Sequence, residues 1–288
     1  MSLEISEVEI KNILTRTSGY LESIATHSLQ PYRGCSFGDS LCGSGCYVQH
    51  NPFVTRGRPW GSFLEVRTNA ASSYLRTVAR ERRYARSKEL PFGIFMSSST
   101  DPFLPQESRF AVSQRLLEAM TEEPPEVLIL QTHTAAVAKH IPLLKRLSKL
   151  CQLRVHISIE TDRDRLPGLP PPASPIEARF LAAQALREAG LKLVVTIAPL
   201  LPIEDPESFF GRLSTVSDAI VIDHFIGGDG SLQGRRTLRT RLPEAMRAVR
   251  PESCSQDYLF KVLDWARKHY QGQIGIGRDG FAARYTEP

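Results

Sequence analysis

Long apolar segments are absent from this sequence of 288 residues. A helix that crosses a bilayer needs roughly 18 or more consecutive apolar residues, and no stretch approaches that length. The sequence also begins without the basic and then apolar segments of a secretion signal, because residues 1–7 carry only acidic charges. We therefore expect a cytoplasmic protein that does not enter the membrane.

Cysteine is scarce and unevenly placed. The sequence has five cysteines, an odd number, and three of them (Cys35, Cys42 and Cys46) fall within a short glycine-rich segment. Such usage is typical of a reducing compartment and of a metal or cluster site, and it argues against a disulfide framework. Cys151, between a predicted helix and a predicted strand, is interpreted as a structural thiol.

Several nucleotide-binding signatures are also missing. A glycine-rich phosphate turn is absent, which argues against a dinucleotide-binding fold. We find neither an aromatic RNA-binding signature nor a helix-turn-helix. Basic charge is nevertheless concentrated: residues 55–88 hold nine Lys and Arg against two Glu, and residues 233–250 hold six Arg against one Glu. These two segments are either solvated faces or contacts to phosphate groups.

Short apolar runs alternate with helical patterns along most of the chain. The runs that predict strands are 92–96, 127–132, 153–159, 191–202 and 219–226, and helical patterns separate them. With the extended segment before the cysteines this gives about six strands, joined by crossovers that require a parallel sheet. We therefore predict an α/β fold, a partial (β/α)6 TIM-type barrel with a small C-terminal extension. The predicted core comprises residues 1–226 and the extension residues 227–288. Ile10, Ile13 and Leu14 have helical spacing and predict a short element that leads into the core.

Polar residues follow the predicted strands at the point where each strand ends. The carboxyl ends of parallel strands meet at one edge of a sheet, so these residues are expected to line one cavity. They are Ser97, Ser98, Ser99, Thr100, Asp101, Gln131, Thr132, His133, Thr134, Ser158, Glu160, Thr196, Ala198, Asp223 and His224.

The three clustered cysteines allow two kinds of site. Clustered thiolates in a flexible loop can ligate an iron–sulfur cluster. Alternatively, His50 follows Cys46 after three residues, and Cys35, Cys42, Cys46 and His50 together could form a tetrahedral Cys3His zinc site. Spacing alone does not separate the two possibilities.

Two longer motifs carry a resemblance to a known family. Gln30-Pro31-Tyr32-Arg33-Gly34-Cys35 leads into the cysteines, and Ser97-Ser98-Ser99-Thr100-Asp101-Pro102-Phe103-Leu104-Pro105-Gln106-Glu107 follows the second predicted strand. Further matches are Ser158-Ile159-Glu160-Thr161 and Ile197-Ala198-Pro199-Leu200-Leu201-Pro202. In this order the motifs resemble radical S-adenosylmethionine (SAM) proteins of the spore photoproduct lyase-like family. Six and then three residues separate the cysteines, a longer spacing than is common in that family.

The resemblance implies a radical SAM enzyme with a [4Fe–4S] cluster and S-adenosylmethionine as cofactors. Cys35, Cys42 and Cys46 would be the cluster ligands. The residues expected to bind the cofactor are Ser97, Ser98, Ser99, Thr100, Asp101, His133, Ser158, Glu160 and Ala198. The enzyme would generate a 5′-deoxyadenosyl radical and abstract hydrogen from a substrate that the sequence does not identify.

The implied partners are a small-molecule or nucleic-acid substrate and an external one-electron reductant such as a ferredoxin or flavodoxin. The alternative is a protein of another class, a zinc-stabilised α/β protein that binds nucleic acid through its two basic segments and has no radical chemistry. It depends on His50 joining the three cysteines.

Overall fold

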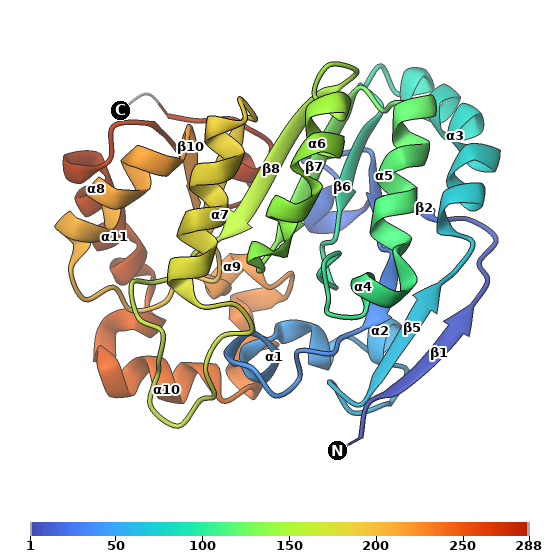
Figure 1. Ribbon diagram of the computed structural model, residues 1–288. Helices are drawn as coiled ribbons and strands as arrows, with labels where there is room; N and C mark the ends of the chain where they lie inside the picture. The colour runs from blue at the N-terminus through green and yellow to red at the C-terminus, as the bar shows by residue number, and fades with distance from the viewer. Residues whose placement is uncertain (1, 287–288) are drawn as a thin grey trace.

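The computed structural model describes residues 2–286, and its centre is an eight-stranded sheet (Figure 1). The strands lie in the order β11-β10-β9-β8-β7-β6-β3-β2, and all neighbours are parallel except β2 and β3. The strands are β2 (Leu14–Arg16), β3 (His27–Leu29), β6 (Gly93–Met96), β7 (Val127–Thr132), β8 (Gln152–Ser158), β9 (Leu193–Ile197), β10 (Ala219–Ile222) and β11 (Gln273–Ile276).

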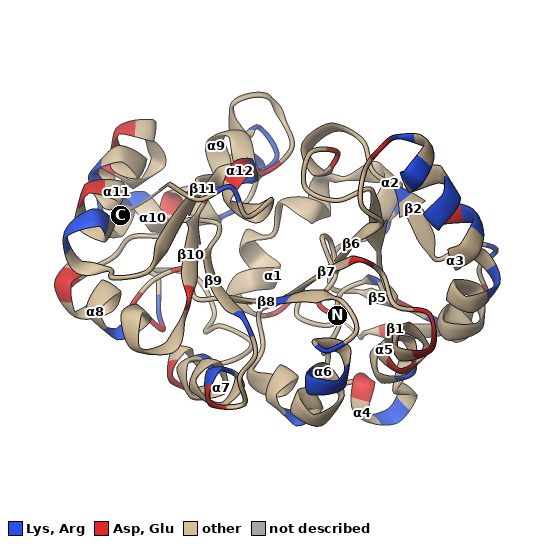
Figure 2. Ribbon diagram, turned by 90° about the horizontal axis from the view of Figure 1, so that it is seen from above, with Lys and Arg blue, Asp and Glu red and all other residues tan. Residues whose placement is uncertain are grey.

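Helices connect the parallel strands and cover the outer side of the curved sheet. They are α3 (Ala70–Ser87), α4 (Glu107–Phe110), α5 (Val112–Glu122), α6 (Ile141–Leu147), α7 (Ile176–Glu188), α8 (Pro206–Val216) and α11 (Gln256–His269). Figure 2 shows the strands as an arc with these helices outside it and α1 (Leu41–Gly45) within it. Within residues 2–286 the end strands β2 and β11 do not pair, so the barrel is open. The predicted fold class, a partial parallel α/β barrel, is confirmed.

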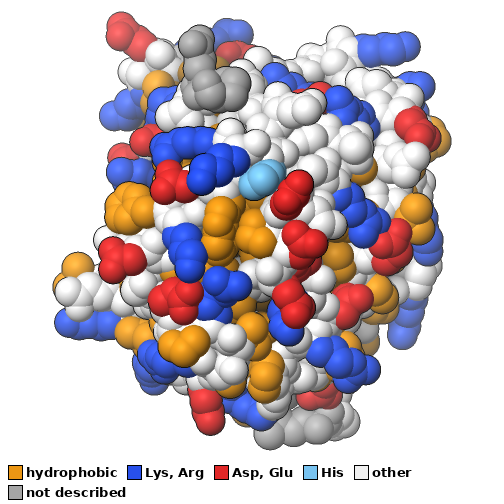
Figure 3. Space-filling model, turned by 90° about the vertical axis from the view of Figure 1, so that its left-hand side faces the viewer, with side chains coloured by type: hydrophobic (Ala, Val, Ile, Leu, Met, Phe, Trp, Pro, Cys, Tyr) orange, Lys and Arg blue, Asp and Glu red, His pale blue; other side chains and the backbone are white. Residues whose placement is uncertain are grey.

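The strands of the sheet are apolar because both of their faces are covered. Every residue of β6, β9 and β10 is buried, which explains why these segments are continuous apolar runs without alternation. Side-chain caps fix the starts of two outer helices: Asp205 accepts from the backbone N–H of Ser208, and Ser255 accepts from that of Tyr258. The outer face that carries α8 and α11 mixes charges of both signs with scattered apolar side chains (Figure 3). Among the helices described, none has the length and apolar character needed to cross a membrane.

A second, three-stranded sheet lies beside the start of the barrel. It contains β1 (Glu4–Val8), β5 (Phe63–Arg67) and β4 (Tyr32–Gly34), in that order. The lead-in segment does not form the helix that the spacing of its apolar residues suggests, but forms the strands β1 and β2. The reason is its contact with α3: Asn69 and Ser73 accept hydrogen bonds from the backbone N–H groups of Ile10 and Ile13 and hold the chain extended.

The C-terminal extension contributes to the main sheet as well as to its covering. It contains α9 (Phe225–Gly228), α10 (Leu242–Val249), α11, β11 and α12 (Gly277–Phe281). Strand β11 pairs in parallel with β10 and is the seventh parallel strand, one more than the sequence predicts. The division at residue 226 stays a prediction, although the sheet itself continues across it.

Candidate functional site

The three clustered cysteines lie around one small cavity at the carboxyl ends of the strands. Cys35 directly follows β4, Cys42 lies in α1, and Cys46 ends that helix. All three line a cavity of about 90 Å³. The opposite wall of this cavity comes from Ser97, Ser98, Ser99, Thr100, Asp101, Gln131 and His133. Figure 1 shows α1 at the end of the sheet toward which β8 points.

Close backbone packing gives the cysteine loop its shape. A Cβ atom on Gly43 would lie 1.9 Å from the carbonyl oxygen of Phe37 and 2.6 Å from Cα of Gly38. Gly34, just before Cys35, has φ of +87° and touches the backbone of Phe63. Neither position has room for a side chain, so the glycines let the loop fold tightly enough to bring Cys35 and Cys42 to one cavity.

Burial disfavours the thiolate forms of the three cysteines. It raises the pKa of Cys35 to about 12 and that of Cys46 to about 11, and it raises the pKa of Cys42 well above its usual value. The mutual repulsion of the thiolates raises the pKa values of Cys35 and Cys42 further. A metal cluster bound in the cavity would supply the positive charge that favours the thiolate forms. The donor set therefore fits a group held by three thiolates.

His50 lies apart from the cavity that the three cysteines line. Zinc requires all of its ligands within about 2.0–2.3 Å of one point. Among residues 2–286, no group of three or more His, Cys, Asp and Glu side chains is placed to hold a metal ion, and this includes the three cysteines. His50 lines neither the small cavity nor the larger one next to it, and its Nε2 atom is buried without a hydrogen-bond partner. Cys35, Cys42 and Cys46 thus line one cavity, and His50, the fourth residue of the alternative hypothesis, does not line it.

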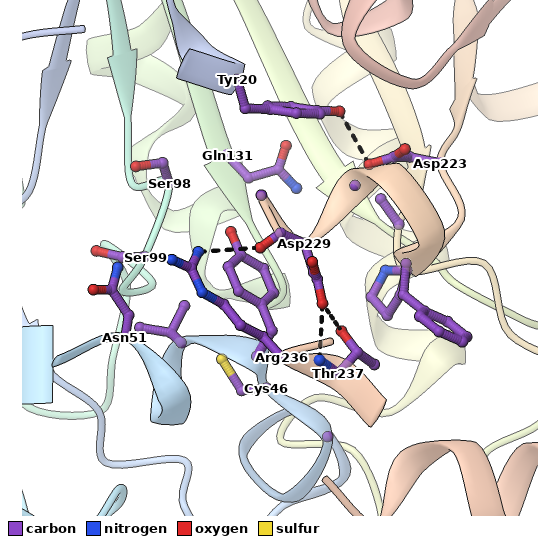
Figure 4. Close-up of a pocket in the computed structure, with 18 of the residues that line it drawn as sticks. Tyr20, Cys46, Asn51, Ser98, Ser99, Gln131, Asp223, Asp229, Arg236 and Thr237 are labelled. Atoms are coloured by element: carbon purple, nitrogen blue, oxygen red, sulfur yellow. Dashed lines mark hydrogen bonds between the residues drawn. The ribbon is translucent and has the colours of Figure 1, made fainter. Parts of the chain in front are cut away.

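A larger cavity of about 520 Å³ adjoins the small one (Figure 4). Both are lined by Cys42, Cys46, Tyr47, Val48, Ser97, Ser98, Ser99, Gln131 and His133. Its volume lies in the usual range for small-molecule sites, about 300–1,000 Å³. Core and extension both contribute to its wall: Glu160 and Ala198 belong to the core, and Asp229, Arg236, Thr237 and Leu242 to the extension.

The turn after β6 forms part of both cavities. Ser97 has φ of +76°, and its buried Oγ has no hydrogen-bond partner. Ser98 accepts a hydrogen bond from Nε2 of Gln30 at 2.7 Å. Thr100 instead donates to the carbonyl of Gly34 at 2.9 Å and so ties the turn to the cysteine loop. Ser97, Ser98 and Ser99 line both cavities, whereas Thr100 lines only the small one.

Asp101 ties this turn to the end of β7. Its carboxylate accepts from the hydroxyl of Thr132 at 3.0 Å and from the backbone N–H groups of Phe103 at 2.8 Å and His133 at 2.6 Å. Burial raises its pKa, and these contacts oppose that rise. With its oxygens occupied, Asp101 is suited to positioning His133 and the serine turn.

A buried chain of charges lies behind the cavity wall. Nδ1 of His133 is 2.8 Å from Oε1 of Glu160, and Nη1 of Arg179 is 2.6 Å from Oε2 of the same carboxylate. Burial favours the protonated form of Glu160, but Arg179 and His133 outweigh it and lower its pKa to about 2. Burial also opposes a charge on His133, yet Glu160 and Asp101 raise its pKa above the usual value. Glu160 and Asp101 therefore favour the protonated form of His133 at the cavity.

Ser158 lies beneath the cavity wall and lines neither cavity, although the sequence places it among the cofactor-binding residues. It is fully buried and accepts a hydrogen bond from Nε2 of Gln131 at 2.7 Å. Thr196 accepts from the same amide nitrogen at 2.9 Å. These two hydroxyls hold the amide nitrogen of Gln131. The other atom of the amide, Oε1, has no hydrogen-bond partner, and Gln131 lines both cavities.

Several cavity residues are not among those predicted from the sequence. Gln131 is expected in the cavity from its strand end but not as a cofactor-binding residue, and Arg236 and Thr237 lie in the second basic segment. Tyr20, Tyr47, Asn51 and Asp229 have no motif that marks them. Their side chains come together only through contacts between distant parts of the chain. The hydroxyl of Tyr20, for example, donates to Asp223 at 3.1 Å across 203 positions of sequence.

Asp223 and His224, both at the end of β10, have different surroundings. Asp223 lines the large cavity, and burial together with Asp229 raises its pKa to about 7, although the Tyr20 hydroxyl opposes that rise. His224 is fully buried away from the cavity, and its Nε2 is 3.0 Å from the carbonyl of Ser253. Asp223 is thus a cavity residue, and His224 connects β10 to the extension.

The residues present fit a cofactor with both polar and aromatic parts. Two buried polar atoms at the shared wall, Oγ of Ser97 and Oε1 of Gln131, have no partner among the described residues. Buried polar atoms are normally hydrogen-bonded, so these two indicate a ligand that supplies the missing groups. Ala198, Pro199, Leu201 and Phe225 provide apolar surface in the same cavity.

Comparison by sequence identifies relatives without a described function. No protein-family model matches the chain. An uncharacterized protein of Mycobacterium tuberculosis is 26% identical over 204 residues, which cover 68% of this chain and 56% of that protein. An uncharacterized protein of Methanocaldococcus jannaschii is 23% identical over 246 residues, which cover 85% of this chain and 87% of that protein. The match thus spans little more than half the length of the mycobacterial relatives.

Comparison by structure identifies the fold. The chain is similar to a mutant of spore photoproduct lyase with bound AdoMet and dinucleoside spore photoproduct, with a TM-score of 0.61 and 14% identity. A second mutant of that enzyme, with dinucleoside spore photoproduct, gives a TM-score of 0.62 and 15% identity. Both similarities cover 94% of this chain and 81% of the other. The resemblance predicted from the motifs is confirmed as a shared fold.

Proposed function

We propose that the protein is a radical SAM enzyme. One observation supports this most strongly: Cys35, Cys42 and Cys46 surround one small cavity, which adjoins a cavity large enough for a cofactor and a substrate. The fold shared with spore photoproduct lyase supports the same proposal. Its cofactors would be a [4Fe–4S] cluster and S-adenosylmethionine.

The two cavities would have different roles. Cys35, Cys42 and Cys46 would hold the cluster in the small cavity, and the larger cavity would take the cofactor and the substrate. When bound, the reduced cluster supplies one electron to the sulfonium of S-adenosylmethionine and so provides methionine and the 5′-deoxyadenosyl radical that abstracts hydrogen from the substrate.

Polar groups at the shared wall would orient the cofactor. Oγ of Ser97 and Oε1 of Gln131 are free to meet its polar groups, and the protonated form of His133, which Glu160 and Asp101 favour, suits a carboxylate. Ser98, Ser99, Glu160 and Ala198 lie in the wall of the same cavity, while Thr100, Asp101 and Ser158 would hold these residues in place. The apolar surface around Leu201 and Phe225 would exclude water from the reacting atoms.

An outside reductant is part of the proposal, because the chain itself offers no source of the electron. A ferredoxin or flavodoxin would serve, and the reaction would take place in the cytoplasm. The substrate is a small molecule or a nucleic acid. DNA photoproduct repair is not proposed, since the comparisons extend to the fold and not to a substrate.

The cluster is tested by anaerobic purification with iron and sulfide analysis. We expect a brown protein, and we expect Cys42→Ala to lose the visible absorbance because a ligand is missing. Cys151→Ala is the matched control, since Cys151 lines neither cavity. A colourless protein with one zinc and no iron would contradict the cluster and favour the alternative with His50.

The chemistry is tested separately with dithionite as the reductant. Incubation of the reduced protein with S-adenosylmethionine should produce 5′-deoxyadenosine, measured by chromatography. Cys42→Ala should give none. An intact cluster that yields no 5′-deoxyadenosine would show that the fold is retained without the radical chemistry.

A further inference from the structure

Arg236 brings a positive charge from the C-terminal extension into the large cavity. Of the described residues that line this cavity, it is the one arginine or lysine. It lies in the second basic segment, next to Arg235, which is exposed and does not line the cavity. Figure 4 shows the Arg236 side chain among the cavity residues, with Asp229 and Thr237 beside it.

The loop of residues 229–237 holds Arg236 in place. The carboxylate of Asp229, which is 1% exposed, accepts from the backbone N–H groups of Ser231 at 2.8 Å and Thr237 at 2.8 Å. It also accepts from the hydroxyls of the same two residues, at 2.6 Å and 3.0 Å. The backbone N–H of Arg236 donates to Oγ of Ser231 at 3.1 Å. The residues on both sides of Arg236 are therefore fixed through one buried carboxylate.

The guanidinium group has capacity for a further partner. Its Nη1 donates to the backbone carbonyl of Asp229 at 3.3 Å, and within residues 2–286 it makes no ion pair with a carboxylate. A guanidinium has five N–H donors, so most remain available. Tyr47 and Asn51 line the same cavity, and Oδ1 of Asn51 is occupied by the N–H of Phe53, which leaves its amide N–H groups free to donate.

The acidic residues of the cavity do not neutralise this charge. Glu160 is paired with Arg179 and His133 on the opposite wall. The oxygens of Asp229 accept from its own loop, and Asp223 accepts from the hydroxyl of Tyr20. None of these carboxylates forms an ion pair with Arg236, so its guanidinium N–H donors stay available to a ligand.

We propose that Arg236, with Tyr47 and Asn51, binds an anionic group of the substrate, a phosphate or a carboxylate. This inference rests on the proposed function, because it takes the wall shared with the cysteines as the place of the cofactor. Arg236 lines only the large cavity and not the small one that all three cysteines line. Arg236 is thus a residue that selects substrates by charge.

The experiment measures binding of inorganic phosphate and of acetate by calorimetry, with anaerobically purified full-length protein. Each anion is titrated with and without saturating S-adenosylmethionine, and S-adenosylmethionine is titrated alone. We expect Arg236→Gln to weaken binding of the preferred anion about tenfold or more, because a charge-assisted hydrogen bond is lost. Arg236→Lys should retain part of the affinity, since the charge remains. Arg235→Gln is the matched control and should bind like the unchanged protein.

Three results separate the possibilities. Weaker anion binding in Arg236→Gln with unchanged S-adenosylmethionine binding supports a substrate subsite. Weaker S-adenosylmethionine binding in Arg236→Gln would overturn it and assign the arginine to the cofactor carboxylate. Equal anion binding in all variants, or none in the unchanged protein, would overturn it as well. Failure of the proposed function would give another result: the unchanged protein would not bind S-adenosylmethionine. The anion titrations do not require S-adenosylmethionine and would still test Arg236.

Discussion

Arg179 balances the buried negative charge of Glu160 behind the cavity wall. Its side chain is almost completely buried, and it donates both to Glu160 and to the backbone carbonyl of Ser158. His133 supports the same carboxylate from the cavity side. The position of His133 in the wall therefore depends on a residue that never touches the cavity.

Replacing Arg179 with Met should destabilise the protein by about 3–5 kcal/mol, because it leaves Glu160 buried with only one cationic neighbour. Urea unfolding at neutral pH measures the change. The double variant Arg179→Met/Glu160→Gln should recover part of the loss, since the uncompensated charge is removed together with its partner.

The matched control is Arg267→Met on α11. Arg267 pairs with Asp264 at 3.1 Å, and both side chains are more than half exposed. Exposed pairs contribute about 0–1 kcal/mol, so this variant should unfold nearly like the unchanged protein. Equal losses for Arg179→Met and Arg267→Met would show that the buried pair does not carry the stability assigned to it.

Among the secondary-structure elements, the parallel strands and their helices are those that the sequence predicts well. Strands β6, β9 and β10 are apolar runs, and β9 (Leu193–Ile197) lies inside the run predicted at 191–202. Strand β11 could not be predicted in this way. Its sequence, Gln273-Ile-Gly-Ile, is short and contains a glycine, and it becomes a strand through pairing with β10.

The cysteine loop shows what spacing can and cannot predict. Three clustered thiols indicated one site, and the structure brings them to one cavity. The residues opposite them could not be read from spacing, because the loop reaches them only through tertiary contacts such as Thr100 to Gly34. The serine turn and His133 were predicted from strand ends. Arg236 and Tyr20 required the folded chain.

Gly43→Ala should disturb this loop directly. The added Cβ would lie 1.9 Å from a backbone oxygen, so the loop must shift, and we expect a loss of about 1–3 kcal/mol and a lower iron content. Gly211→Ala on α8 is the control, because nothing lies within 4 Å of its added Cβ. Alanine in a helix is favoured over glycine by about 0.5–1 kcal/mol, so that variant should be equally or more stable. Normal iron content in Gly43→Ala would contradict the tight packing of the loop.

In the whole molecule, core and extension depend on each other. Strand β11 completes the parallel sheet, and α11 supports a loop of the core, because the Tyr258 hydroxyl accepts from the N–H of Ile203 at 2.9 Å. Arg250 donates to the carbonyl of the same residue at 3.1 Å. The cavity wall also comes from both parts. We therefore expect a single cooperative unit, even though the sequence suggested a boundary at residue 226.

The two tryptophans report on this expectation, since the sequence has only two. Trp60 lies next to the cysteine loop and packs against Phe63, whereas Trp265 lies on α11 and packs against Tyr258. Fluorescence of Trp265→Phe and Trp60→Phe variants should give the same urea midpoint, because both report one transition. Two separate midpoints, measured in the same cluster state, would show that the extension unfolds by itself.

Helix α10 covers the cysteine loop, and this has a consequence for the order of events during synthesis. Leu41 of that loop packs with Leu242 and Met246 of α10, which the ribosome adds some two hundred residues later. Chains are made from the N-terminus, at about 5–20 residues per second. The nascent chain therefore presents all three thiols for a period before their cover exists. A cluster delivered during translation meets an open loop, whereas one delivered to the finished protein must pass through the cavity.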